Sequence, residues 1–109
     1  MIDMENEMLD DDGYPTEQAL QLARELPCTE SAESPYDSLQ EIWHWPDLVK
    51  MKIGSQELEL HTGGWSGNEE VIAALEASPF WFSCWMRSEH GGHYYFDMSR
   101  LKKVAKADL

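Results

Sequence analysis

The chain has 109 residues, of which 42% are hydrophobic and 11% aromatic; this length suits one domain, and this composition excludes a wholly disordered protein. Acidic residues outnumber basic ones 21 to 8, and the formal net charge is −13. Because nucleic-acid binding needs clustered Lys and Arg to neutralise phosphates, this charge disfavours direct binding to DNA or RNA.

The acidic residues are concentrated in the N-terminal half. Residues 1–47 hold 13 acids against one base, Arg24, a net charge of −12, whereas residues 48–109 hold 8 acids against 7 bases, a net charge of −1. Residues 1–12, with six acids and no regular apolar spacing, are predicted to form a flexible acidic arm, and residues 13–109 a single domain. Such an acidic half suits a partner protein with a basic groove, and it also favours solubility.

Two helices are predicted in the first half of the domain. Apolar residues recur at helical spacing over residues 16–26, and Pro27 ends the pattern. Ser34 directly before Pro35 is typical of a helix N-terminus, which predicts a second helix over residues 35–43.

A β-hairpin is predicted around Gly54-Ser55, a pair that suits a two-residue type II′ turn. Closing the hairpin there sets apolar residues against each other on one face and opposite charges against each other on the other face. The expected pairs are Val49 with Leu60, Met51 with Leu58, Lys50 with Glu59, and Lys52 with Glu57.

Beyond this hairpin the sequence predicts a third helix and a second hairpin. Ser66 and Glu69 have the spacing of a capping box at the start of the helix. The hairpin joins strands over residues 80–87 and 93–98 through a three-residue loop, residues 90–92. Its register predicts a core face of Phe80, Phe82, Cys84, Met86, Tyr94, Phe96 and Met98. The opposite face would then hold Trp81, Trp85, Arg87, Tyr95 and Asp97.

Ser99 is expected to cap a short final helix over residues 101–106. The element order is then α-α-β-β-α-β-β-α. This order predicts an α+β domain with an antiparallel sheet of about four strands, formed by two hairpins, with helices packed on it.

The chain has no segment typical of export or of a membrane span. The acidic N-terminus is unlike a signal peptide, and no apolar run approaches the roughly 20 residues of a membrane helix. Cys28 and Cys84 lie in unlike contexts, which leaves a disulfide open without indicating one. We therefore expect a cytoplasmic protein with no membrane partner.

Few residues carry recognisable chemistry, and no catalytic residue or cofactor is assigned. The segment from Gly64 to Asn68 is close to the G-x-S-x-G nucleophile elbow, but Asn68 replaces the last glycine, and Ser66 is better explained as a helix cap. Three histidines lie at or near glycine pairs and could hold zinc if the two turns converge: His61, His90 and His93.

Aromatic residues form the main candidate binding surface. Two alternatives stay open for the predicted outer face: helices cover it as part of the core, or part of it is exposed and binds a protein, since Trp, Tyr and Arg dominate interface energetics. The candidate binding residues are Trp65, Trp81, Trp85, Arg87 and Tyr95.

Several segments resemble a family of small uncharacterised proteins encoded by tailed bacteriophages and prophages. The resemblance would cover about residues 11–98, and it implies a bacterial host cytoplasm and a role toward host or phage machinery. It implies no activity. The segments are Gly13-Tyr14-Pro15-Thr16, Trp45-Pro46-Asp47, Thr62 to Glu69, Phe80-Trp81 with Cys84-Trp85, and Gly91 to Phe96.

Together these features predict a non-enzymatic protein-binding factor, in one form an acidic inhibitor of a host nucleic-acid-processing or defence protein. A second hypothesis is a small metal-dependent or hydrolytic enzyme that uses His61, His90 and His93. A small-ligand-binding or regulatory protein is a third.

Overall fold

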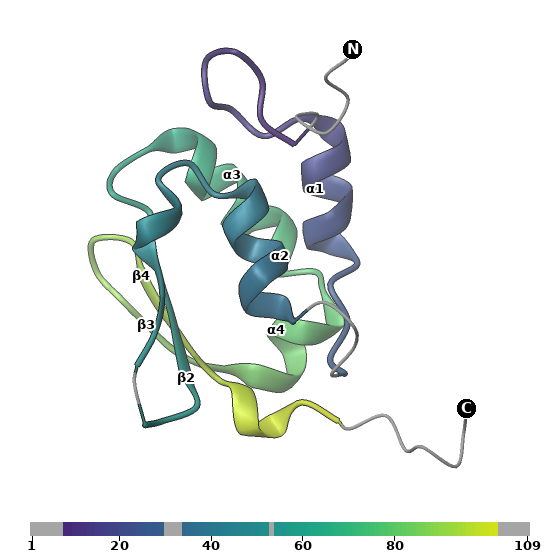
Figure 1. The fold of residues 1–109 in the computed structure, drawn as a ribbon, viewed down its shortest axis with the longest axis vertical. Helices are drawn as coiled ribbons and strands as arrows, with labels where there is room; N and C mark the ends of the chain where they lie inside the picture. Colours follow the sequence, from purple (N-terminus) through teal and green to yellow (C-terminus); the bar gives the residue numbers. More distant parts are fainter. Residues whose placement is uncertain (1–7, 30–33, 53, 103–109) are drawn as a thin grey trace.

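The computed structural model describes residues 8–29, 34–52 and 54–102. Within them, four antiparallel strands form one sheet in the order β1-β2-β4-β3, and the helices lie on one side of it (Figure 1). The strands are β1 Val49–Met51, β2 Glu57–His61, β3 Trp85–Glu89 and β4 His93–Asp97. The α-helices are α1 Glu17–Arg24, α2 Pro35–Ile42, α3 Ser66–Leu75 and α4 Pro79–Cys84. The predicted α+β class is confirmed.

The first hairpin has the predicted register. Val49 pairs with Leu60, Lys50 with Glu59, and Met51 with Leu58. The turn differs in detail, because the Ser55 amide donates to the Lys52 carbonyl, which places Gly54 at the third turn position with a φ of 81°.

Both N-terminal helices begin within one residue of their predicted starts and end earlier than predicted, α1 at Arg24 and α2 at Ile42. The Thr16 hydroxyl accepts a hydrogen bond from the Ala19 amide at the start of α1, and the Ser34 hydroxyl accepts one from the Asp37 amide at the start of α2. Each bond satisfies a backbone donor that has no partner within the helix.

The predicted capping box at α3 is wrong. Trp65 occupies the cap position and makes no side-chain capping bond, and Ser66 is the first helical residue. Its hydroxyl lies 3.0 Å from the Tyr14 hydroxyl instead. Ser66 therefore joins two distant segments of the chain.

The largest correction concerns residues 79–84, which form helix α4 and not a strand. The Ser78 hydroxyl accepts a hydrogen bond from the Trp81 amide, and Pro79 occupies the first helical turn. Phe80 and Cys84, four residues apart, lie on the buried face of this helix. Phe82 points away from the core and is 92% exposed, so its predicted core position is wrong.

The second hairpin keeps its predicted loop, since Glu89 pairs with His93 across residues 90–92. A β-bulge between Trp85 and Arg87 then shifts the register by one residue, so that Phe96 pairs with Trp85 and not with Met86. Met86 consequently lies outside the core and is 41% exposed.

The chain after β4 also differs from prediction. Residues Met98–Arg100 form a 3-10 turn in which the Asp97 carboxylate accepts a hydrogen bond from the Ser99 amide, so Asp97 is the cap. Leu101 and Lys102 are not helical, and the rest of the predicted final helix lies outside the described residues.

Residues 8–12 of the predicted flexible arm fold back on the domain. The Thr16 amide donates to the Met8 carbonyl, and the Asp10 carboxylate accepts hydrogen bonds from the amides of Asp12 and Tyr14. These hydrogen bonds hold residues 8–16 in an ordered loop. Residues 1–7 of the predicted arm lie outside the described residues.

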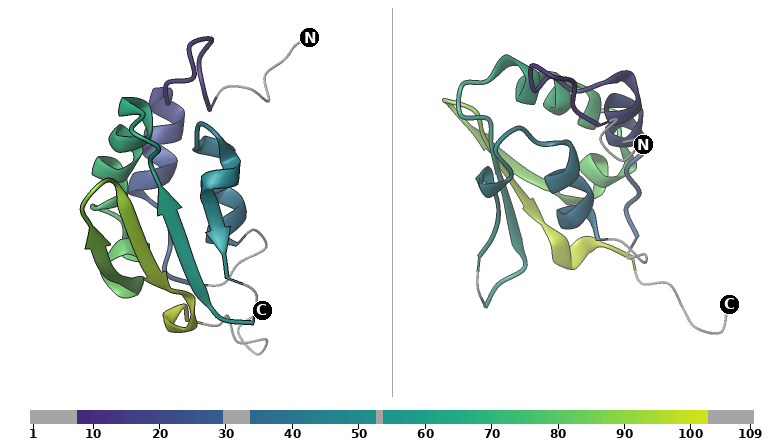
Figure 2. Two further views of the ribbon diagram at one scale, coloured as in Figure 1. Left: turned by 90° about the vertical axis from the view of Figure 1, so that its left-hand side faces the viewer. Right: turned by 45° about the horizontal axis from the view of Figure 1, so that its top comes forward.

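The core lies between the sheet and the helices. The buried face of the sheet carries Val49, Leu58, Leu60 and Phe96. The helices and their flanking segments cover it with Leu39, Ile42, Trp43, Val71, Leu75 and Phe80. The opposite face of the sheet has no helix over it among the described residues, and Figure 2 (left) looks onto its strands.

Candidate functional site

The open face of the sheet is lined by charged and polar side chains. Strand pairing places them in rows across β1, β2, β4 and β3. The four carboxylates are Glu57, Glu59, Glu89 and Asp97, and the side chains that are not acidic are Lys50, Arg87, His61, His93 and Tyr95. Three of these carboxylates have a basic partner, because Arg87 pairs with Glu57 and Glu89, and Arg100 pairs with Asp97.

One end of this face holds a histidine pair. His61 on β2 and His93 on β4 are direct cross-strand partners, and their Nδ1 atoms lie 2.7 Å apart. The other ring nitrogen of His61 lies 3.0 Å from a carboxylate oxygen of Glu59. Two of the three predicted metal-ligand candidates therefore come together, whereas His90 lies in the exposed turn beside them.

The middle of the face holds a tyrosine enclosed by charges. The Arg87 guanidinium lies 4.0 Å from the centre of the Tyr95 ring, and the Tyr95 hydroxyl donates to Glu89. Arg87 also makes ion pairs with Glu57 and Glu89. Desolvation, followed by the hydrogen bond to Glu89, raises the pKa of Tyr95, so this hydroxyl stays protonated at neutral pH.

The two tryptophans predicted to share this face with Arg87 and Tyr95 lie elsewhere. Trp81 on α4 packs against Phe96, and it stacks on Trp85 at 6.1 Å with nearly parallel rings. Because Trp85 pairs with Phe96, the tryptophan pair lies at the β3 edge of the helix-covered side. The predicted common face is therefore wrong.

Trp81 and Trp85 are separated from Arg87 and Tyr95 because residues 79–84 form a helix and not a strand. The same helix, with the start of β3, presents large apolar side chains to solvent. We define the α4–β3 patch as Phe82, Trp85 and Met86, which are 92%, 42% and 41% exposed. Trp81, half-buried behind them, anchors the patch to the core. The sequence pattern missed the exposure of Phe82 and Met86, although Ser78-Pro79 is a helix-start signal that could have indicated α4 and so the outward position of Phe82.

Trp65 belongs to a different cluster, at the N-terminus of α3. Its ring stacks on His44 at 4.7 Å and packs against Tyr14, while its Nε1 donates to the Gly13 carbonyl. The Asn68 side chain accepts from the His44 amide and donates to the His44 and Thr62 carbonyls. The glycine-rich segment from Gly64 to Asn68 thus serves to hold together loops that are distant in sequence.

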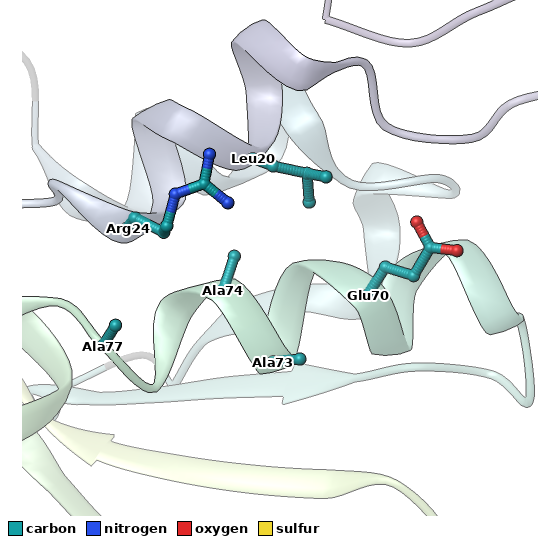
Figure 3. Close-up of a pocket in the computed structure, with 6 residues that line it drawn as sticks. All are labelled: Leu20, Arg24, Glu70, Ala73, Ala74 and Ala77. Atoms are coloured by element: carbon teal, nitrogen blue, oxygen red, sulfur yellow. The ribbon is translucent and has the colours of Figure 1, made fainter.

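A shallow groove of about 380 Å³ lies between α1 and α3 (Figure 3). Its floor is mostly alanine, and its two charged residues are Arg24 and Glu70. Arg24 is engaged by Glu17 and Gln21 on its own helix. The groove therefore offers few polar groups to orient a ligand.

The Cys84 thiol is a poor candidate for a nucleophile. Cys28 and Cys84 are both free, and Cys84 is fully buried. Burial, and next the negative charge of Asp97, raise the pKa of Cys84 to about 11. At neutral pH this sulfur is a protonated thiol, which is a weak nucleophile.

Among the described residues, no group of three or more His, Cys, Asp and Glu side chains is placed to hold a metal ion. No helix in the described part of the chain is long and apolar enough to cross a bilayer. In comparisons with known proteins, no family model, no curated protein and no solved structure matches the chain.

Proposed function

We propose that this protein is a non-enzymatic protein-binding factor that binds its partner through the α4–β3 patch. The observation that carries the proposal is the 92% exposure of Phe82, together with the exposure of two further large apolar side chains within four residues of it in the chain, Trp85 and Met86. Full burial of one such side chain contributes about 1.5–3 kcal/mol. Neighbouring exposed side chains of this size are typical of interaction sites.

The residue types of the patch also suit an interface. Trp85 is held by its stack on Trp81 and by a hydrogen bond from its Nε1 to Ser88. A side chain that is already ordered loses less conformational entropy on binding than a mobile one. Trp85 therefore suits the role of a rigid anchor, with Phe82 and Met86 filling adjacent pockets of the partner.

The net charge indicates the chemistry of the partner. A chain with a net charge of −13 is attracted to a basic protein surface and repelled by nucleic acid. We propose a partner with an apolar socket surrounded by Lys and Arg, and we expect the association rate to fall as salt is added. An inhibitor of a host nucleic-acid-processing or defence protein would fit this chemistry, and the resemblance to phage and prophage proteins supports a bacterial cytoplasm as its proposed setting.

The test is affinity purification from bacterial cells that express the full chain. Wild type is compared with Phe82→Ala and with Gln56→Ala, which alters an exposed residue outside the patch, between β1 and β2. We expect wild type and Gln56→Ala to recover the same stoichiometric partner. With the purified partner, Phe82→Ala should weaken the Kd by at least about 30-fold, equivalent to about 2 kcal/mol.

Two results would contradict the proposal. One is the absence of any stoichiometric partner across several bacterial hosts. The other is a partner that Phe82→Ala, Trp85→Ala and wild type bind equally well, because binding would then lie outside the α4–β3 patch.

A further inference from the structure

His61 and His93 form a close pair on the open face of the sheet. Two imidazole Nδ1 atoms at 2.7 Å repel each other unless one carries a hydrogen that the other accepts. The pair is half-buried at the end of β2 and β4, on the side of the sheet that the helices do not cover.

His61 is held in the orientation that a metal ligand requires. Its Nε2 lies 3.0 Å from the Glu59 carboxylate, and the two side chains are 18% and 19% exposed. Donation from Nε2–H to this carboxylate leaves the Nδ1 lone pair directed at His93. A carboxylate that orients a histidine in this way is a recurring feature of metal sites.

His93 is held by the glycine pair that precedes it. Gly91 has a φ of 100°, and a Cβ there would lie 3.3 Å from the His93 Nε2, so the ring lies against the turn. A Cβ on Gly92 would overlap the Thr62 hydroxyl, and the Gly92 carbonyl accepts a hydrogen bond from the Thr62 amide. These contacts bring the Gly91-Gly92 turn against the end of β2, which carries His61.

We propose that His61 Nδ1 and His93 Nδ1 bind one divalent transition cation of borderline softness, such as Zn²⁺, with Glu59 as the positioning residue. Two nitrogens bound tetrahedrally to zinc at about 2.0–2.1 Å lie roughly 3.3 Å apart, so the rings must separate by about 0.6 Å and tilt until both Nδ1 lone pairs point at the ion. Water or a donor atom from a partner completes the coordination. The Glu59 carboxylate beside His61 favours a cation there.

The site is tested by calorimetric titration of the untagged full-length protein with ZnCl₂ at neutral pH. We expect one saturable equivalent with ZnCl₂ and none with MgCl₂, because Mg²⁺ prefers oxygen ligands. His61→Asn and His93→Asn should each abolish this equivalent, and His90→Asn, on the same turn, should retain it. Glu59→Gln should weaken zinc binding by about 10- to 100-fold.

Nitrogen NMR of the histidine rings in the wild-type protein gives an independent measurement that does not depend on the folding of a variant. Zinc should shift the Nδ1 resonances of His61 and His93 and leave those of His90 unchanged. The proposal is overturned if zinc shows no saturable binding, if the shifts occur at Nε2, or if His61→Asn and His93→Asn bind zinc as tightly as wild type.

Discussion

The β1–β2 hairpin and the segment from α4 to β3 look alike in sequence but fold by different rules. In the hairpin, alternate residues sort into a buried face and an open face, and the register follows from charge and hydrophobicity. In the second segment, residues sort with a spacing of four, so that Phe80 and Cys84 are buried while Phe82 is exposed. The comparison shows that a short apolar run does not reveal its period when polar residues do not interrupt it regularly.

Introducing a charge on the buried face of the hairpin should cause the largest loss in the free energy of unfolding. Leu58 is fully buried between the sheet and the helices. Leu58→Asp would leave an unpaired carboxylate in the core, and we expect a loss of more than about 4 kcal/mol in the free energy of unfolding. Circular dichroism should show an unfolded or barely cooperative protein. A cooperative melt near the wild-type temperature would show that the face assignment is wrong.

A pair of phenylalanines tests the helical spacing of α4 directly. Phe80 is fully buried and stacks on Phe96 at 5.1 Å, whereas Phe82 is almost fully exposed. We expect Phe80→Ala to lower the free energy of unfolding by about 3–5 kcal/mol and Phe82→Ala to change it by less than about 0.5 kcal/mol. Urea denaturation measures both variants. Equal losses would support a strand with both side chains in the core.

Cys84, at the buried end of α4, should make the free energy of unfolding depend on pH in the alkaline range. The pKa of the Cys84 thiol is about 11 in the folded protein, compared with 9.0 for the unburied thiol of the unfolded chain. Above pH 9 the unfolded chain releases this proton while the folded protein retains it, so stability that is present below pH 9 is lost as the pH rises to 11. The expected loss is about 2–3 kcal/mol.

Cys84→Ala is the matched control for this dependence. Other groups that titrate in alkali, such as Tyr94 and Tyr95, remain in both proteins, so their contribution cancels in the difference. Denaturation at pH 8 and at pH 11 should show a larger loss in wild type than in Cys84→Ala. Identical losses would mean that Cys84 is not protected from solvent.

A smaller loss of stability than that from the Cys84 titration is expected on the open face of the hairpin. Glu59 lies opposite Lys50 and beside His61, at the surface of the sheet. Partly exposed ion pairs contribute little, so Glu59→Lys should cost less than about 1 kcal/mol. A thermal melt compared with that of Leu58→Asp checks the contrast between adjacent residues on one strand. A loss similar to that of Leu58→Asp would contradict the two-face description.

The candidate sites were predictable only in part. The sequence pointed to the Gly91-Gly92 turn and to His61 and His93, because histidines beside glycine turns are easily recognised. It did not show that β2 and β4 are neighbours, and this pairing is what brings the two rings together. It also assigned Phe82 and Met86 to the core, since hydrophobicity alone does not distinguish a buried residue from one that is exposed for binding.

The sequence by itself determined the features that depend on near neighbours in the chain. These features are the register of the first hairpin, the three-residue loop of the second, and the helix starts at Thr16 and Ser34, where turn geometry and capping bonds act over a few residues. Only the tertiary structure decided the helical state of residues 79–84, the bulge at Met86 and the strand order. Each of these depends on the burial of Phe80, Cys84 and Phe96 against segments that are distant in sequence. Where the local sequence suits both a helix and a strand, such burial decides between them.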